Sequence, residues 1–146
     1  MSWKAWLEDG RIETHSPVRA EIDGHRQAAE RSLADAALQG ISPEGRFQLA
    51  YNAALGLATL AVIASGYRIK SRVGHHQITF EAAGVALGKE ASELIKYFDR
   101  CRRTRNVISY EGDEISTEQA NELLRECKRF AALVGAWLAK HRAELA

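Results

Sequence analysis

The most regular pattern in this sequence is a run of apolar residues at three- and four-residue steps between Ser116 and His141. Such spacing places the apolar side chains on one face of a helix. Ser116-Thr117-Glu118-Gln119 has the form of a capping box, in which the Ser and Gln side chains satisfy backbone groups at a helix start. The segment therefore predicts an amphipathic helix over residues 117–141, whose apolar face must pack against other helices.

Four further helices follow from the same kind of spacing. The dipeptides Ser16-Pro17 and Ser42-Pro43 each combine an N-cap residue with a proline suited to the first helical turn. Gly40, Gly66 and Gly88 stand where helices are expected to end. The expected helices cover residues 16–38, 42–65, 76–87 and 89–110.

The expected fold is all-α, an antiparallel bundle of about five helices in one domain. No segment shows the alternation of apolar and polar residues that a strand requires. The chain has 146 residues, 46% of them hydrophobic and 27% charged, which suits a soluble domain that buries its own core. We expect the bundle to cover residues 16–146, preceded by an N-terminal extension over residues 1–15, with a basic loop over residues 66–76.

Charge, cysteine content and the N-terminal sequence limit the classes of protein. Lys and Arg (20) almost balance Asp and Glu (19), so nucleic acid or anionic lipid would have to bind at a local basic patch. Cys101 and Cys127 are too few for a disulfide scaffold and are expected to be reduced core thiols. The N-terminus lacks the apolar region of a signal peptide, so a cytoplasmic location is expected.

Residues 47–67 carry no charge and are long enough to cross a bilayer. Polar residues such as Gln48, Asn52 and Thr59 interrupt this segment, and glycines and alanines dilute its hydrophobicity. We therefore expect a helix buried in the bundle core, with a membrane span as the alternative.

Four arginines, Arg100, Arg102, Arg103 and Arg105, lie within six residues near the end of the fourth helix. Charge runs on helices are usually solvated faces. Here the spacing of the packed face continues from Phe98 through Arg102 and Arg105, so at least one guanidinium should lie on that face. An unpaired buried guanidinium is costly, so such an arginine is expected at a cleft, a helix end or a subunit interface. The guanidinium group of arginine can donate two hydrogen bonds to one phosphate, so such an arginine suits phosphate binding.

The segment Arg105-Asn106-Val107-Ile108-Ser109-Tyr110 resembles the motif of the HEPN superfamily of small helical nucleotide-binding domains. In that motif an arginine, commonly followed by a polar residue such as Asn, precedes a histidine after four to six intervening residues. Three upstream segments are similar to stand-alone bacterial members that have an Ala-rich helix, a basic turn and a Gly-His-His start. These segments are Gly45–Ala54, Ala64–Arg68 and Gly74–His76, and the resemblance covers about residues 16–145.

The resemblance implies a protein that binds RNA or a nucleotide, often a ribonuclease toxin of a toxin–antitoxin or defence system, or a partner of a small nucleotidyltransferase. It also implies a homodimer in which two copies of the motif meet. Arg105 would hold a phosphate, with Asn106 as its polar neighbour. Tyr110 stands where the motif has histidine, and a phenol with a pKa near 10 is about a thousandfold less available as a base at neutral pH. Catalysis is therefore expected to be weakened or lost.

The missing histidine leaves several interpretations open. Tyr110 could pack at the helix end, bind a phosphate or stack on a base, or act as an acid or base with a pKa lowered by the arginines. His75 and His76 could replace the missing imidazole. Alternatively, they form a first helical turn with one packed ring and one solvated ring.

The expected basic loop contains further cations that could extend the arginine cluster: Arg68, Lys70, Arg72, His75 and His76. If this loop lies beside the arginines, the two segments would form a phosphate-binding surface. A scattered arrangement fits the sequence equally well. Acids of the N-terminal segment, such as Glu8 and Glu13, could also cover a basic face.

No metal site or cofactor is expected, because the sequence has no metal-ligand spacing of His, Cys or carboxylates and no phosphate-binding glycine loop. We predict that the protein binds RNA or a nucleotide phosphate through the arginine cluster. One alternative is a metal-independent endoribonuclease in which Tyr110 or His76 transfers protons. Another is a structural bundle that dimerises or docks a partner through Val134, Trp137 and Leu138.

Overall fold

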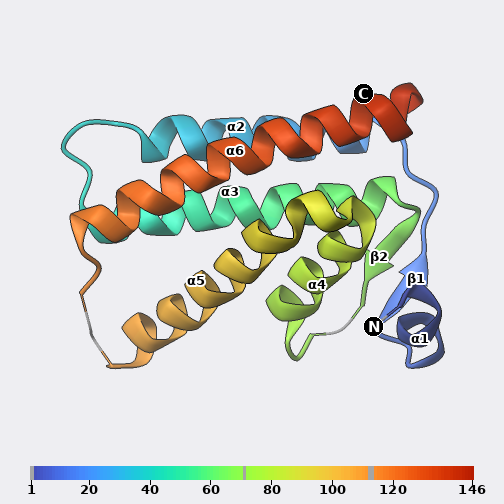
Figure 1. Ribbon diagram of the computed structural model, residues 1–146, viewed down its shortest axis with the longest axis horizontal. Helices are drawn as coiled ribbons and strands as arrows, with labels where there is room; N and C mark the ends of the chain where they lie inside the picture. The colour runs from blue at the N-terminus through green and yellow to red at the C-terminus, as the bar shows by residue number, and fades with distance from the viewer. Residues whose placement is uncertain (1, 71, 112–113) are drawn as a thin grey trace.

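The computed structural model describes residues 2–70, 72–111 and 114–146, except for the side chains of residues 108–111. The described residues form an all-α bundle with one small two-stranded sheet, which confirms the expected fold class. Its elements are α1 (Trp3–Glu8), β1 (Ile12–Thr14), α2 (Arg19–Ala36), α3 (Pro43–Ala64), β2 (Tyr67–Ile69), α4 (His75–Leu87), α5 (Ser92–Glu111) and α6 (Thr117–His141). Figure 1 shows α2 and α6 along one side of α3, with α4 and α5 on the other.

α3 is the central helix because its side chains are apolar or small on almost every face. Phe47, Tyr51, Leu57 and Leu60 are all at most 4% exposed. α2 runs antiparallel to α3, as expected, whereas α6 runs in the same direction as α3 (Figure 1). α3 is apolar enough to cross a membrane, with a mean hydropathy of 1.6, yet 67% of that apolar window is buried within the fold. A core helix therefore accounts for this charge-free segment.

Two of the three helix starts predicted from capping residues are confirmed. Ser42 caps α3, since its Oγ accepts from Gly45 N–H at 3.0 Å and Pro43 follows it. Ser116 caps α6 with both bonds of the capping box, which it shares with Gln119. Both starts depend on residues within four positions of each other, which is why the sequence alone predicts them.

The predicted helix start at Ser16-Pro17 is wrong. α2 begins at Arg19, after residues with extended backbone. His15 N–H donates to the Gly66 carbonyl at 2.9 Å, which continues the pairing of β1 with β2 and keeps the chain extended. His15 Nε2 then contacts the Glu21 carboxylate at 2.8 Å, in the first turn of α2. Tertiary pairing therefore overrides the local capping signal.

The expectation of no strands is also wrong, because the expected basic loop contains β2. β1 and β2 are antiparallel, with Ile12 opposite Ile69. Three residues in each strand are too few to show an alternating pattern in the sequence. The pairing holds the N-terminal segment on the bundle, where Trp6 is 0% exposed and Trp3 stacks on Tyr67 with ring centroids 4.4 Å apart.

Arg46 joins three parts of the bundle at the end where α2 stops. Its Nε donates to the Ala36 carbonyl at 2.8 Å and its Nη2 to the Leu38 carbonyl at 3.0 Å. Its Nη1 donates to Asn121 Oδ1 on α6 at 2.9 Å. These bonds satisfy carbonyls that the end of α2 leaves without helical partners.

We expect Ser116→Ala to lower the free energy of unfolding by about 1 kcal/mol. The variant removes the acceptor that Ser116 Oγ offers to Gln119 N–H at 3.1 Å. Urea denaturation followed by circular dichroism measures the loss. Ser116→Thr keeps a hydroxyl cap and should lose less, so equal losses in the two variants would contradict the assigned cap.

Candidate functional site

The arginine cluster lies on α5, and part of it faces the bundle. The Arg102 side chain is 18% exposed, which confirms that one arginine occupies the packed face. Its Nε donates to Asp99 Oδ1 at 3.0 Å, while Arg103 Nη1 donates to Asp99 Oδ2 at 2.9 Å. One carboxylate therefore serves two guanidinium groups, and the local charge stays positive.

Arg105 connects the end of α5 to α3. Its Nε donates to Gln48 Oε1 at 3.1 Å, and its guanidinium carbon lies 5.3 Å from the centroid of the Tyr51 ring. A cation over an aromatic face is held by the ring quadrupole. Arg105 has no carboxylate partner among the side chains that the structure describes. Its charge is therefore positioned without being neutralised.

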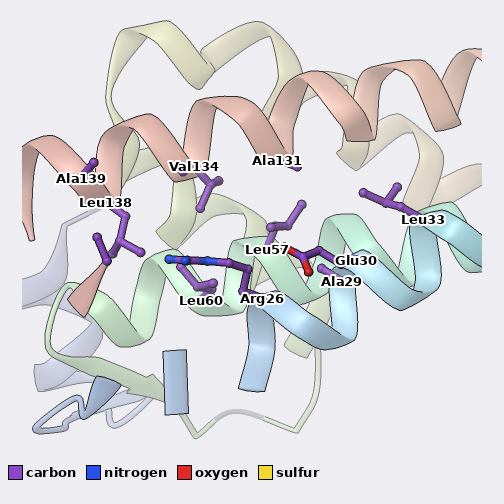
Figure 2. A pocket seen from close by; sticks show the side chains of 12 residues that line it. Arg26, Ala29, Glu30, Leu33, Leu57, Leu60, Ala131, Val134, Leu138 and Ala139 are labelled. Atoms are coloured by element: carbon purple, nitrogen blue, oxygen red, sulfur yellow. The ribbon is translucent and has the colours of Figure 1, made fainter. Parts of the chain in front are cut away.

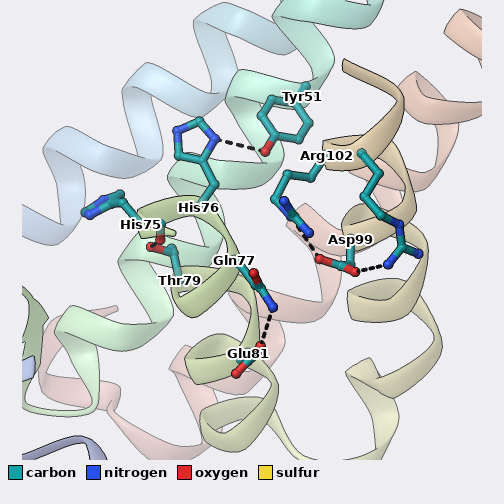
Figure 3. A network of polar contacts seen from close by, with 9 residues as sticks. Tyr51, His75, His76, Gln77, Thr79, Glu81, Asp99 and Arg102 are labelled. Carbon is teal, nitrogen blue, oxygen red and sulfur yellow. Dashed lines mark hydrogen bonds and ion pairs between the residues drawn. The ribbon is translucent and has the colours of Figure 1, made fainter. Parts of the chain in front are cut away.

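His76 joins this group from the first turn of α4. Its Nδ1 lies 3.0 Å from the Tyr51 hydroxyl oxygen, as Figure 3 shows. Tyr51 thus contacts both His76 and Arg105, two residues that the sequence analysis singled out in separate segments. We call Tyr51, His76, Arg102 and Arg105 the Arg–His site.

Burial and the arginines set the protonation of the site. Burial raises the pKa of Tyr51 to about 12, although Arg105 and Arg102 oppose the shift. Burial also lowers the pKa of His76 below its ordinary value of 6.5, and the positive charge of Arg105 adds to the effect. At neutral pH the phenol keeps its proton and the imidazole is neutral.

The hydrogen bond of Tyr51 also fixes the tautomer of His76. Tyr51 is 0% exposed. Among the described residues, the hydrogen-bond partner of its hydroxyl is His76 Nδ1. The protonated phenol therefore donates to Nδ1, and the neutral ring carries its hydrogen on Nε2. Figure 3 shows Nε2 on the side of the ring that faces away from Tyr51. The His76 ring is only partly buried, so this N–H can donate to a ligand.

The other residues predicted on α5 have more peripheral positions. Arg100 contacts the ring of Tyr97, with its guanidinium carbon 5.7 Å from the centroid. Asn106 is exposed. Tyr110 lies in α5, but its side chain is outside the described residues, so its three interpretations stay open.

The cations of the segment before α4 do not all join the site. Arg68 lies on β2 and its Nε is 3.7 Å from a carboxylate oxygen of Glu13 on β1, so an N-terminal acid faces part of this segment as considered above. Lys70 and Arg72 have exposed side chains. The ring of His75 lies beside that of His76, with centroids 6.2 Å apart.

Sequence reasoning missed three residues that organise the site: Gln48, Tyr51 and Asp99. Tyr51 has no site role in the sequence pattern, although Gln48 stands one turn before it in an otherwise apolar segment. Asp99 precedes the arginines by three and four positions, which is the spacing for ion pairs along a helix. The sequence contains these spacings, but it does not show that α3 packs against α4 and α5.

A cavity of about 350 Å³ lies between α2, α3 and α6 (Figure 2). Its walls include Leu57, Leu60, Val134 and Leu138, and it contains none of the residues of the Arg–His site. Cys101 and Cys127 are buried free thiols, and burial raises the pKa of both. Among the described residues, no group of three or more His, Cys, Asp and Glu side chains could hold a metal ion.

The sequence matches no protein-family model, no curated protein and no solved structure. The chemistry of the Arg–His site is therefore the basis for assigning a function. Two arginines offer charged forks of donors, and His76 adds an N–H that is not used within the site. This set of donors suits a phosphate group.

We expect the pKa of His76, measured by NMR titration of its ring, to lie below 6.5. Arg105→Gln should raise this pKa, because it removes a nearby positive charge. Tyr51→Phe should also raise it, because the phenol donates to the neutral ring. A His76 pKa at or above 6.5, or no change in Tyr51→Phe, would contradict the assigned protonation.

Proposed function

We propose that this protein is a HEPN-like module that binds single-stranded RNA by a backbone phosphate at the Arg–His site. The observation that carries this proposal is that Arg105 and His76, from α5 and α4, both contact Tyr51, with Arg102 near enough to lower the pKa of its hydroxyl. A guanidinium held over a buried aromatic ring is preorganised, so little side-chain entropy is lost when phosphate binds. Single strands suit such a site because their phosphates and bases are both accessible.

The resemblance described above adds a cellular context to this proposal. It implies a homodimer that works within a toxin–antitoxin or defence system beside an antitoxin or a nucleotidyltransferase. A cytoplasmic location belongs to the same proposal. A protein-docking bundle is the competing class, but Val134 and Leu138 of its proposed docking face are buried in the core, and Trp137 is half-buried. The net positive charge of the arginine cluster favours phosphate binding over protein docking. Among the described residues, Asp99 is the one carboxylate that pairs with these arginines.

Salt dependence of RNA binding tests the proposal. Fluorescence anisotropy with a labelled uridine-rich RNA should give an affinity that falls as salt rises, with a log–log slope of about −0.7 for each phosphate contact. The affinity should also rise as pH falls through the pKa of His76, because bound phosphate favours the charged ring. Absence of binding at low salt, or binding indifferent to salt, would overturn the proposal.

RNA cleavage is a second candidate function, and the position of His76 Nε2, which faces away from Tyr51, favours it. In such a reaction the ribose 2′-oxygen attacks phosphorus, its proton passes to water, and the bond to the 5′-oxygen breaks. The protonated form of His76 would donate its Nε2 proton to the leaving 5′-oxygen, which gives a 2′,3′-cyclic phosphate and a free 5′-hydroxyl and leaves the ring neutral. Arg105 and Arg102 would stabilise the charge that develops on the phosphate.

Incubation of labelled RNA with the protein in EDTA separates binding from cleavage. If His76 is the acid, cleavage should persist in EDTA and fall about a hundredfold or more in His76→Gln. Arg129→Gln, a change of an exposed arginine on α6, is the control and should cleave as the wild type does. Cleavage that survives His76→Gln would remove His76 from this role, and binding without cleavage would leave the RNA-binding function alone.

A further inference from the structure

A cavity of about 380 Å³ lies between α4 and α5, directly beside the Arg–His site. Its lining includes Asp99, the same carboxylate that holds Arg102, and Gln77, which follows His76 in the chain. Figure 3 shows Gln77 and Glu81 on α4 facing Asp99 and Arg102 on α5. A nucleotide whose phosphate binds at the Arg–His site would therefore have its base within reach of this cavity.

The polar groups on the α4 side of the cavity offer more hydrogen-bond acceptors than donors. Gln77 Nε2 donates to Glu81 Oε1 at 3.2 Å. This bond leaves the second carboxylate oxygen of Glu81 and the amide oxygen of Gln77 as acceptors, with a single remaining N–H on the amide. A ligand that satisfies this set must present adjacent N–H donors.

The remaining walls suit a flat heterocycle. Phe80 and Ile95 provide apolar surface between the two helices. Arg100 and Arg103 lie on the α5 side, and the guanidinium plane of arginine is a common stacking partner for unpaired bases. The cavity therefore combines an apolar wall, stacking groups and a polar edge.

We propose that this cavity binds the guanine base of the nucleotide whose phosphate occupies the Arg–His site, an inference that rests on the proposed function. On its Watson–Crick edge, guanine carries the N1–H and the N2 amino group side by side. Among the standard RNA bases, guanine alone has two adjacent donors there. The free oxygen of Glu81 accepts from one of these donors, and the amide oxygen of Gln77 accepts from the other. The protein thus selects guanosine within single-stranded RNA.

The test compares the binding of short uridine-rich RNAs that contain one guanosine, one inosine or one adenosine. Inosine keeps N1–H but lacks the N2 amino group, so it isolates one of the two donors. The guanosine RNA should bind about tenfold more tightly than the adenosine RNA, with inosine between them. Glu81→Gln should remove this preference, so that the guanosine RNA binds no more tightly than the adenosine RNA. Glu118→Gln, on the exposed first turn of α6, is the matched control and should keep the preference.

The outcomes separate this inference from the function on which it rests. If RNA binds without preferring guanosine, or the preference survives Glu81→Gln, the guanine site is overturned while RNA binding stands. If the wild-type protein binds none of the RNAs at low salt, the proposed function fails and the guanine site fails with it.

Discussion

Replacing Arg105 by glutamine is expected to weaken the binding of single-stranded RNA by roughly 10- to 100-fold, because charge-assisted hydrogen bonds contribute about 1.5–3 kcal/mol. Arg105 has no carboxylate partner among the described side chains, and Tyr51 and Gln48 hold its position. The slope of log affinity against log salt should fall by about 0.7, the contribution of one phosphate contact to a single strand. Fluorescence anisotropy over a series of salt concentrations measures both effects.

Arg129→Gln is the matched control for this change. It removes the same charge from an exposed position on α6, where Arg129 pairs with Glu126 at 2.7 Å. Its RNA affinity should stay within about twofold of the wild type, because exposed ion pairs contribute little. If both variants lost affinity equally, the attraction would come from overall charge, and the Arg–His site would lose its assigned role.

Replacing Phe98 by alanine is expected to lower the free energy of unfolding by about 3–5 kcal/mol. Phe98 is 0% exposed, and its ring centroid lies 5.7 Å from that of Phe80 and 4.9 Å from that of Phe130. It therefore joins α5 to both α4 and α6 at the centre of the core. Removal of the ring leaves a cavity where three helices meet, and urea denaturation measures the loss.

Phe98→Leu fills more of the same space and should lose clearly less stability than Phe98→Ala. Phe98 also precedes Asp99, so a shift of α5 in the alanine variant should weaken RNA binding even where the protein stays folded. A small loss of stability in Phe98→Ala, close to that of Phe98→Leu, would show that the three rings do not form the centre of the core.

The candidate site could be predicted in part. The sequence placed Arg105 and Arg102 at the end of a helix and singled out His76 as a replacement imidazole. The sequence did not predict that these residues lie close together, because they meet at Tyr51, which is 25 positions from His76. The bond between Gln48 and Arg105 spans 57 positions. Contacts at such separations depend on how helices pack, and no local spacing encodes them.

The sequence by itself determined the helices whose starts and faces depend on nearby residues. The capping box of Ser116, the Ser42-Pro43 start and the apolar character of α3 are local features, and all three are present as predicted. Only the tertiary structure decided that Ser16-Pro17 starts no helix, because strand pairing with a segment near Gly66 outweighs a local cap. It also decided the protonation of His76, since burial and the charge of Arg105 come from separate helices that meet around Tyr51.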